Sequence, residues 1–168
     1  MFNFVDRIRY AYYKWKHGEQ ANQQYIATDE LIKALKNRRS VTYISLLLGN
    51  NIKLDYREEK SDYSLIHIAC KFKNSLDVIK LFVAKGFVLD IKTKYNITLL
   101  HAALSQSNGQ STNFDVIKYL IDNGLDPNEL SHSFNSPIML SCVGSNNYKI
   151  RKFLLENGAK INKKHDYN

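Results

Sequence analysis

The chain has 168 residues, the size of one domain, and its 44% hydrophobic and 24% charged residues are typical of a globular protein. Without a run of 18 apolar residues or a signal-peptide core, neither a membrane-spanning helix nor secretion is expected. The net charge of +8 comes from basic residues spread along the chain, which argues against a specific nucleic-acid site, and two cysteines exclude a disulfide framework and favour the cytoplasm.

The first predicted element is an amphipathic helix over residues 1–17. At about 100° per residue, its apolar residues share one stripe about 120° wide, and His17 and Gly18 offer a stop. We expect this helix to cap the apolar edge of the element that follows it. The alternative is a peripheral membrane protein, in which the stripe docks on an anionic membrane, or a helix that enters a partner's groove. The contacts would then come from Phe4, Ile8, Tyr12 and Trp15.

Four similar segments follow along the chain. The first and weakest pairs residues 30–35 with 41–48, and the other three pair 64–70 with 76–86, 98–103 with 114–128, and 136–142 with 149–162. His67 and His101 are 34 residues apart, and a polar insertion at 105–113 lengthens the third copy. Each copy predicts a short helix and then a second helix with apolar residues at helical spacing. A glycine in the left-handed conformation is predicted to close three of the second helices, at Gly86, Gly124 and Gly158.

These copies resemble the ankyrin repeat family, whose pattern is T-P-L-H-x-A-A, a short turn, a V-V-K-L-L-L helix and then G-A-D-V-N. Leu65 and Leu99 depart from it where the family has Pro, as does Met139 where it has His. The resemblance implies an all-α solenoid of about four helix-turn-helix repeats over residues 26–162, behind the amphipathic capping helix. The predicted repeats are approximately 28–55, 56–90, 91–128 and 129–162, with residues 1–25 as helix and linker, 163–168 as a tail and no further domain.

The residues that could carry chemistry fit a scaffold. In the family, the histidine at the position of His67 and His101 hydrogen-bonds the turn, and Ser64 and Thr98 would supply the partner hydroxyls here. Cys70 and Cys142 are interpreted as small buried thiols. No motif for a metal site, a cofactor or catalysis is present, so we predict neither cofactor nor metal, and no enzyme activity.

The resemblance implies that a protein partner binds the concave surface made by the turn tips and the exposed side of the first helices. We predict partner-binding residues at Arg57, Lys71, Phe72, Lys92, Lys94, Tyr95, His132 and Phe134. Tyr95 and Phe134 carry most weight because aromatic residues are enriched among interface hot spots, although packing against a neighbouring tip is the alternative. The basic residues at this edge favour a partly acidic partner.

The composition also bears on the setting of this predicted interaction. Short ankyrin proteins rich in Asn, Ile, Lys and Tyr resemble those of large DNA viruses and intracellular bacteria, which engage host signalling proteins. We therefore expect a host-directed effector or inhibitor of signalling in the cytoplasm. One possibility is a viral protein that resembles the NF-κB inhibitor family. The remaining alternatives are non-specific nucleic-acid binding and a subunit of a homo-oligomer.

Overall fold

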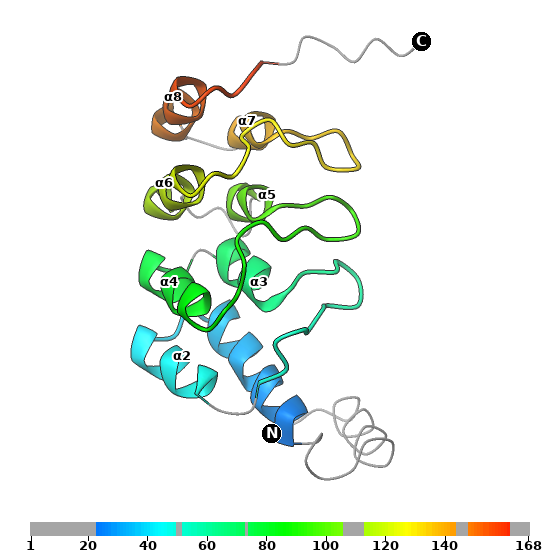
Figure 1. The fold of residues 1–168 in the computed structure, drawn as a ribbon, viewed down its shortest axis with the longest axis vertical. Coiled ribbons are helices and arrows are strands. Elements are labelled where there is room, and N and C mark those ends of the chain that lie inside the picture. The colour runs from blue at the N-terminus through cyan, green and yellow to red at the C-terminus, as the bar shows by residue number, and fades with distance from the viewer. Residues whose placement is uncertain (1–22, 50–51, 73, 106–112, 144–147, 162–168) are drawn as a thin grey trace.

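The computed structural model describes residues 23–49, 52–72, 74–105, 113–143 and 148–161, and every regular element within these segments is a helix. These described residues form four successive helix pairs (Figure 1). The first pair consists of a helix over residues 23–36 and α2 (Val41–Leu48). The other pairs are α3 (Leu65–Lys71) with α4 (Leu76–Ala84), α5 (Leu99–Leu104) with α6 (Phe114–Asp122), and α7 (Pro137–Ser141) with α8 (Tyr148–Glu156). The predicted helix-pair solenoid is confirmed.

The helix pairs stack into two layers. Helix α5 packs between α3 and α7 in the inner layer, while α2, α4, α6 and α8 contact one another in turn in the outer layer. Extended turns project from the inner layer on the side away from the outer helices (Figure 1). We call these turns tip 1 (residues 57–63), tip 2 (92–97) and tip 3 (131–135).

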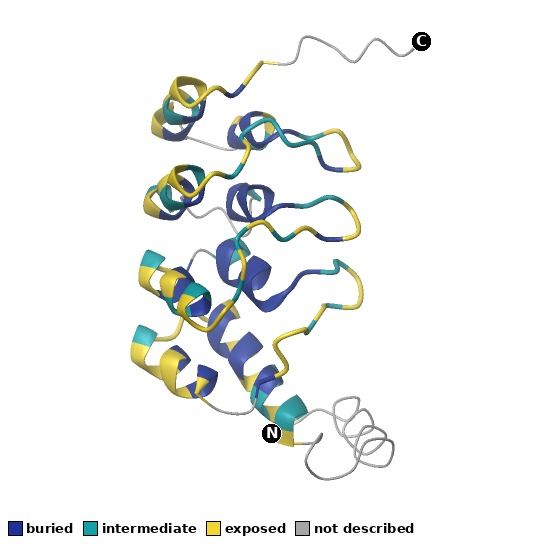
Figure 2. Ribbon diagram, viewed as in Figure 1, coloured by how far each residue is buried: buried dark blue, intermediate teal, exposed yellow. Residues whose placement is uncertain are grey.

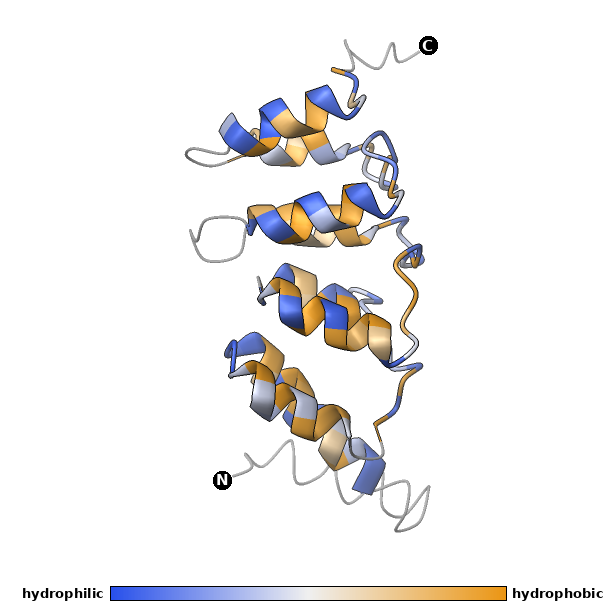
Figure 3. Ribbon diagram, turned by 60° about the vertical axis from the view of Figure 1, so that its left-hand side comes forward, coloured by the Kyte–Doolittle hydropathy of each residue, from blue (hydrophilic) through white to orange (hydrophobic). Residues whose placement is uncertain are grey.

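Burial follows from the place of each layer. Helix α5 is buried along its whole length and α3 is buried except at Lys71, because both lie between neighbouring repeats (Figure 2). The outer helices bury only one stripe, which in α4 consists of Val78, Ile79 and Phe82, and hydrophilic residues alternate with this stripe along the helices (Figure 3). One pair could not bury its apolar face alone, so stacking supplies the core.

The helix ends obey the predicted rules. Gly86, Gly124 and Gly158 have φ values of 91°, 89° and 86°, so the left-handed closure of these three helices is confirmed. At the other end, the Thr98 hydroxyl accepts a hydrogen bond from the backbone N–H of His101, and the ring of His101 accepts one from the Thr98 backbone N–H. This reciprocal capping box fixes the start of α5 directly after tip 2.

Candidate protein-interaction surface

The three tips share one pattern of backbone hydrogen bonds. In tip 2, the N–H of Thr93 donates to the carbonyl of Ile97 and the N–H of Asn96 donates back to the carbonyl of Thr93. Tip 3 repeats both bonds with Ser131, Phe134 and Asn135, and tip 1 is one residue longer. Each tip is therefore a closed turn whose shape is set by its own hydrogen bonds.

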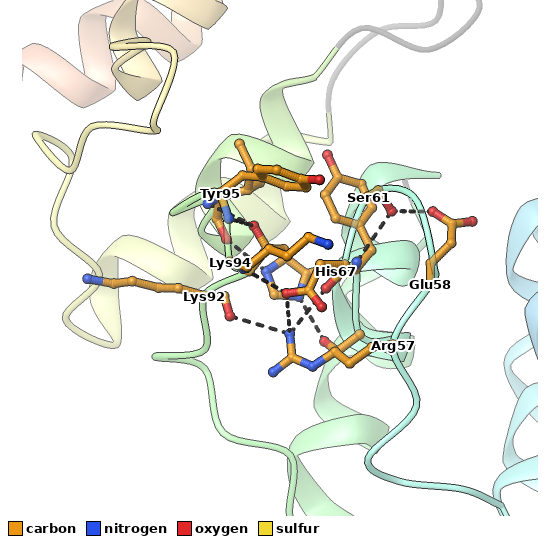
Figure 4. Close-up of polar contacts among 12 residues, drawn as sticks. Arg57, Glu58, Ser61, His67, Lys92, Lys94 and Tyr95 are labelled. Carbon is orange, nitrogen blue, oxygen red and sulfur yellow. Dashed lines mark hydrogen bonds and ion pairs between the residues drawn. The ribbon is translucent and has the colours of Figure 1, made fainter.

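Polar side chains tie tip 1 to tip 2 (Figure 4). The Arg57 guanidinium donates to the carbonyl oxygens of Asp62 and Lys92, at 3.2 and 3.3 Å. The Asp62 carboxylate accepts from the backbone N–H of Lys94 at 2.7 Å and lies 3.9 Å from Arg57. Arg57 is exposed as predicted for a partner-binding residue, but its guanidinium is also part of the scaffold between repeats.

Similar contacts tie tip 2 to tip 3. The Lys92 ammonium lies 3.0 Å from the Glu129 carboxylate, and the Asn96 amide donates to the same carboxylate at 2.9 Å and to the carbonyl of Leu130. The hydrogen bonds from Asn96 and then Lys92 lower the pKa of Glu129, and the bond to Glu129 raises the pKa of Lys92. The backbone N–H of His132 also donates to the carbonyl of Tyr95 at 2.9 Å.

Beneath the tips, the two repeated histidines join neighbouring repeats. His67 Nδ1 lies 2.8 Å from the Ser64 hydroxyl and His67 Nε2 lies 3.0 Å from the carbonyl of Ile97 in the next repeat. His101 makes the corresponding contacts with Thr98 at 2.8 Å and Asn135 at 2.8 Å. The predicted hydroxyl partners are present, and the bond into the next tip is an addition that the sequence did not predict.

Both imidazoles are held neutral. Burial lowers the pKa of His67 to about 4, against the opposing bond to the carbonyl of Ile97, and burial likewise lowers the pKa of His101. A neutral ring that donates from Nε2 to a carbonyl can accept the Ser64 or Thr98 hydroxyl proton at Nδ1, so both ring nitrogens are satisfied. These contacts are those expected of histidines with a structural role.

Aromatic side chains stand out on tips 2 and 3. Tyr95 is 42% exposed and Phe134 is 54% exposed, and His132 between them in sequence is exposed as well. The Lys94 ammonium lies over the Tyr95 ring, 5.1 Å from its centroid. Figure 4 shows Lys94 and Tyr95 beside the hydrogen bonds that join Arg57 and Asp62 of tip 1 to tip 2. Arg57 and Lys92 are exposed too, so all six predicted residues on the tips are accessible.

The two predicted residues on the first helices are less accessible. Lys71 and Phe72, at the end of α3, are both half-buried. The Lys71 ammonium lies 4.9 Å from the centroid of the Tyr63 ring, and the Lys36 ammonium lies 5.9 Å from that of Phe72. Lys36 also pairs with Glu58 at 3.4 Å. These contacts continue the surface from the tips toward the first helix pair.

Some predictions fall on other parts of the chain. Phe4, Ile8, Tyr12 and Trp15 lie outside the described residues, as does most of the 105–113 insertion. Cys70 is buried as predicted, and burial raises the pKa of its thiol to about 12. The prediction was wrong for Cys142, which is exposed because no further described helix covers this side of α7.

Sequence reasoning missed the residues that tie the tips together, chiefly Asp62, Asn96 and Glu129. A signal existed for two of them, because Asp62 and Asn96 are 34 residues apart, the same interval as His67 and His101. Other contacts between neighbouring repeats lie at the ends of the inner helices that are away from the tips. There, the buried Asn74 amide donates to the carbonyls of Leu35 and Ala69, both at 3.1 Å.

Other kinds of site find no support in the described segments. Among those residues, no group of three or more His, Cys, Asp or Glu side chains is placed to hold a metal ion. Within the same residues, no helix is long and apolar enough to cross a membrane. The surface itself is a row of rigid turns beside a layer of stacked helices, which defines a helical repeat protein.

Comparison with known proteins gives the family. The pattern of ankyrin repeats (3 copies) matches residues 31–131 and 66–165, so the chain belongs to the ankyrin repeat family. The repeats of this family mediate protein–protein interaction, and the chain is a protein-binding repeat protein.

Three relatives are similar at lower identity. NF-kappa-B inhibitor zeta of Homo sapiens and that of Bos taurus are each 28% identical over 141 residues, which is 82% of this chain and 19% of the relative. An ankyrin repeat protein of Borreliella burgdorferi is 29% identical over 109 residues, 60% of this chain and 47% of the relative. The chain thus spans about a fifth of the length of the NF-kappa-B inhibitors.

Proposed function

We propose that the protein is a non-enzymatic binding module whose tips and first helices hold one protein partner. The observation that carries this proposal is the exposure of Tyr95 and Phe134 on tips whose backbones are fixed by hydrogen bonds within and between repeats. A fixed backbone means that little conformational entropy is lost on binding, and an exposed aromatic ring offers large contact area. The bound state would mask the surface of the partner by steric exclusion.

We further propose that the partner is a signalling protein and that NF-κB is the first one to test. The support is the similarity to two proteins named as NF-kappa-B inhibitors, which extends over most of the described repeats. A role against a host protein in the cytoplasm stays part of this proposal, and its support is the composition of the chain.

A direct binding measurement tests both parts. Purified NF-κB is titrated into the fluorescently labelled full-length chain, in parallel with a Tyr95→Ala/Phe134→Ala double variant and a Leu46→Gln control. Leu46 is 66% exposed on α2 in the outer layer, so it tests loss of an apolar side chain away from the tips. Saturable binding lost only in the double variant is expected. Absence of binding contradicts NF-κB as the partner, and equal binding by all three contradicts the surface.

A further inference from the structure

The last described helix pair has an apolar outer face. Helices α7 and α8 lie at one end of the stack, and no helix of the described segments lies beyond them (Figure 1). A hollow of about 400 Å³ on this side is lined mostly by apolar side chains, which include Met139, Tyr148, Leu155 and Ile161. These four are between 43% and 72% exposed. We call this surface the end face. The terminal repeat of a stack ordinarily presents a polar surface to water, so the apolar end face indicates a binding surface.

The end face is of the kind that accepts helices elsewhere in the stack. One repeat earlier, α5 packs against α7 and α6 packs against α8. Cys142 and Arg151, which line the hollow, take the positions of Leu104 and Ile117, and these two counterparts are 1% and 0% exposed. Because a helix pairs its backbone groups internally, two helices offer no edge to which an extended strand could add. A helix is therefore the segment that suits this face.

Arg151 sets the chemistry that such a helix must have. Its guanidinium donates to the carbonyl of Ser141 at 3.2 Å, which uses one of its five N–H donors. Among the described residues, no carboxylate forms an ion pair with Arg151. A helix that covered Arg151 with apolar side chains alone would bury an unpaired charge, which is strongly unfavourable. The occupant must therefore bring an acceptor, and a carboxylate matches a guanidinium best.

The other charges at the hollow favour the same kind of occupant. Lys152 lies 3.8 Å from Glu156, and both side chains are exposed, so this pair contributes little and an acidic partner could share Lys152. A second copy docked through the same face would bring together two surfaces of the same sign, on chains that each carry a net charge of +8. A flat membrane would leave the hollow unfilled.

We propose that the end face binds an amphipathic helix of a protein partner, with an apolar side chain in the hollow and a carboxylate on Arg151. This is a second interaction surface, on the helices of the last pair and not on the tips. It goes beyond the proposed function, because either surface can bind its partner without the other.

The first test is a selection on the full-length chain from a displayed library of helical peptides of about 16 residues. Apolar residues are fixed at i, i+3, i+4 and i+7, and the other positions are random. We expect the selected peptides to be rich in Asp and Glu, and their affinity to fall at least about tenfold with Leu155→Gln. The control is Leu46→Gln, which also removes an exposed leucine but lies on α2 in the first pair, and it should leave the affinity unchanged.

A matched pair of charge substitutions separates Arg151 from a general attraction of acidic peptides to a basic chain. Arg151→Gln and Lys80→Gln lower the net charge equally, and Lys80 is exposed on α4. We expect the affinity to fall about tenfold with Arg151→Gln and less than about twofold with Lys80→Gln at the same ionic strength. Equal losses would overturn the role of Arg151. Leu155→Gln tests the face without touching the bond from Arg151 to Ser141.

The second test locates the bound peptide. The chain has two methionines, Met1 and Met139, so labelling their methyl groups with carbon-13 gives one NMR signal from the hollow, which Met139→Leu assigns. We expect this signal to shift saturably when a selected peptide is added, and to shift less in the Leu155→Gln chain at the same peptide concentration.

Several results would overturn the inference. They are neutral or basic selected peptides, no saturable peptide, or a Met139 signal that selected peptides do not change. A Met139 signal that changes with the concentration of the chain alone would assign the face to a second copy. One that shifts only with vesicles of phosphatidylcholine and phosphatidylserine would assign it to a membrane. None of these results decides the proposed function, because the Tyr95→Ala/Phe134→Ala variant tests the tips separately.

Discussion

Lowering the pH from 7 to 5 should remove about 2 kcal/mol from the free energy of unfolding through His67 alone. Its pKa is about 4 in the folded chain against 6.5 for a free side chain, so between these values the unfolded chain binds more protons. The stability is therefore fully present above pH 6.5 and is lost as the pH falls toward 4. Each pKa unit corresponds to about 1.4 kcal/mol, which gives about 3 kcal/mol below pH 4.

The assay is urea unfolding followed by circular dichroism at several pH values between 7 and 5, for the wild type and for His67→Gln. The variant will be less stable at pH 7, because it loses the contacts with Ser64 and Ile97, but its dependence on pH should be shallower. The wild type should lose about 1 kcal/mol per pH unit more than the variant near pH 5.5. Equal slopes for the two chains would refute the buried neutral imidazole.

Three further substitutions test the scaffold by the same urea unfolding. Phe82→Ala should cost about 3–5 kcal/mol, because the ring is fully buried and packs edge-on against Phe87 at 4.9 Å; a cost below about 1 kcal/mol would contradict this packing. Asn74→Ala should cost about 2 kcal/mol because it removes the two hydrogen bonds that the buried amide donates to the carbonyls of Leu35 and Ala69, and the exposed Asn157→Ala serves as control. Gly124→Ala should cost about 1 kcal/mol from backbone strain alone, since no atom lies within 4 Å of the added Cβ; an unchanged stability would exclude the left-handed closure.

Local features of the fold were predictable from the sequence. The interval between His67 and His101 predicted the length of the repeat, and the spacing of apolar residues predicted the second helix of each pair. Glycines such as Gly124 predicted where these helices end. These signals are readable because each depends on residues close together in the chain. The bond of each histidine to a hydroxyl three residues earlier belongs to the same class.

Contacts between repeats were harder to predict. Arg57 reaches the carbonyl of Lys92, 35 residues away, and Asp62 reaches the backbone of Lys94, so both depend on how one tip sits over the next. Sequence reasoning therefore placed Arg57 on the surface without seeing that it also joins the tips. Exposure of Cys142 was missed for a related reason, because a repeat position predicts burial only where a further helix pair covers it.

The left-handed backbone of Phe134 could not be predicted from the sequence either. The sequence marked this residue as an exposed aromatic, but only the φ of 56° shows that it takes the position of Asp62 and Asn96. The exposure of Tyr95 and Phe134 thus had a signal in the sequence, whereas the left-handed backbone of Phe134 did not. Partner binding by either residue stays a prediction.

Affinity capture from a eukaryotic lysate, compared by quantitative mass spectrometry, tests most directly whether the tips recognise a protein. The wild type, Tyr95→Ala/Phe134→Ala and Leu46→Gln are immobilised in equal amounts. We predict a protein retained saturably by the wild type and by Leu46→Gln and lost from the double variant. A set of captured proteins that is the same for all three chains would contradict recognition by the tips.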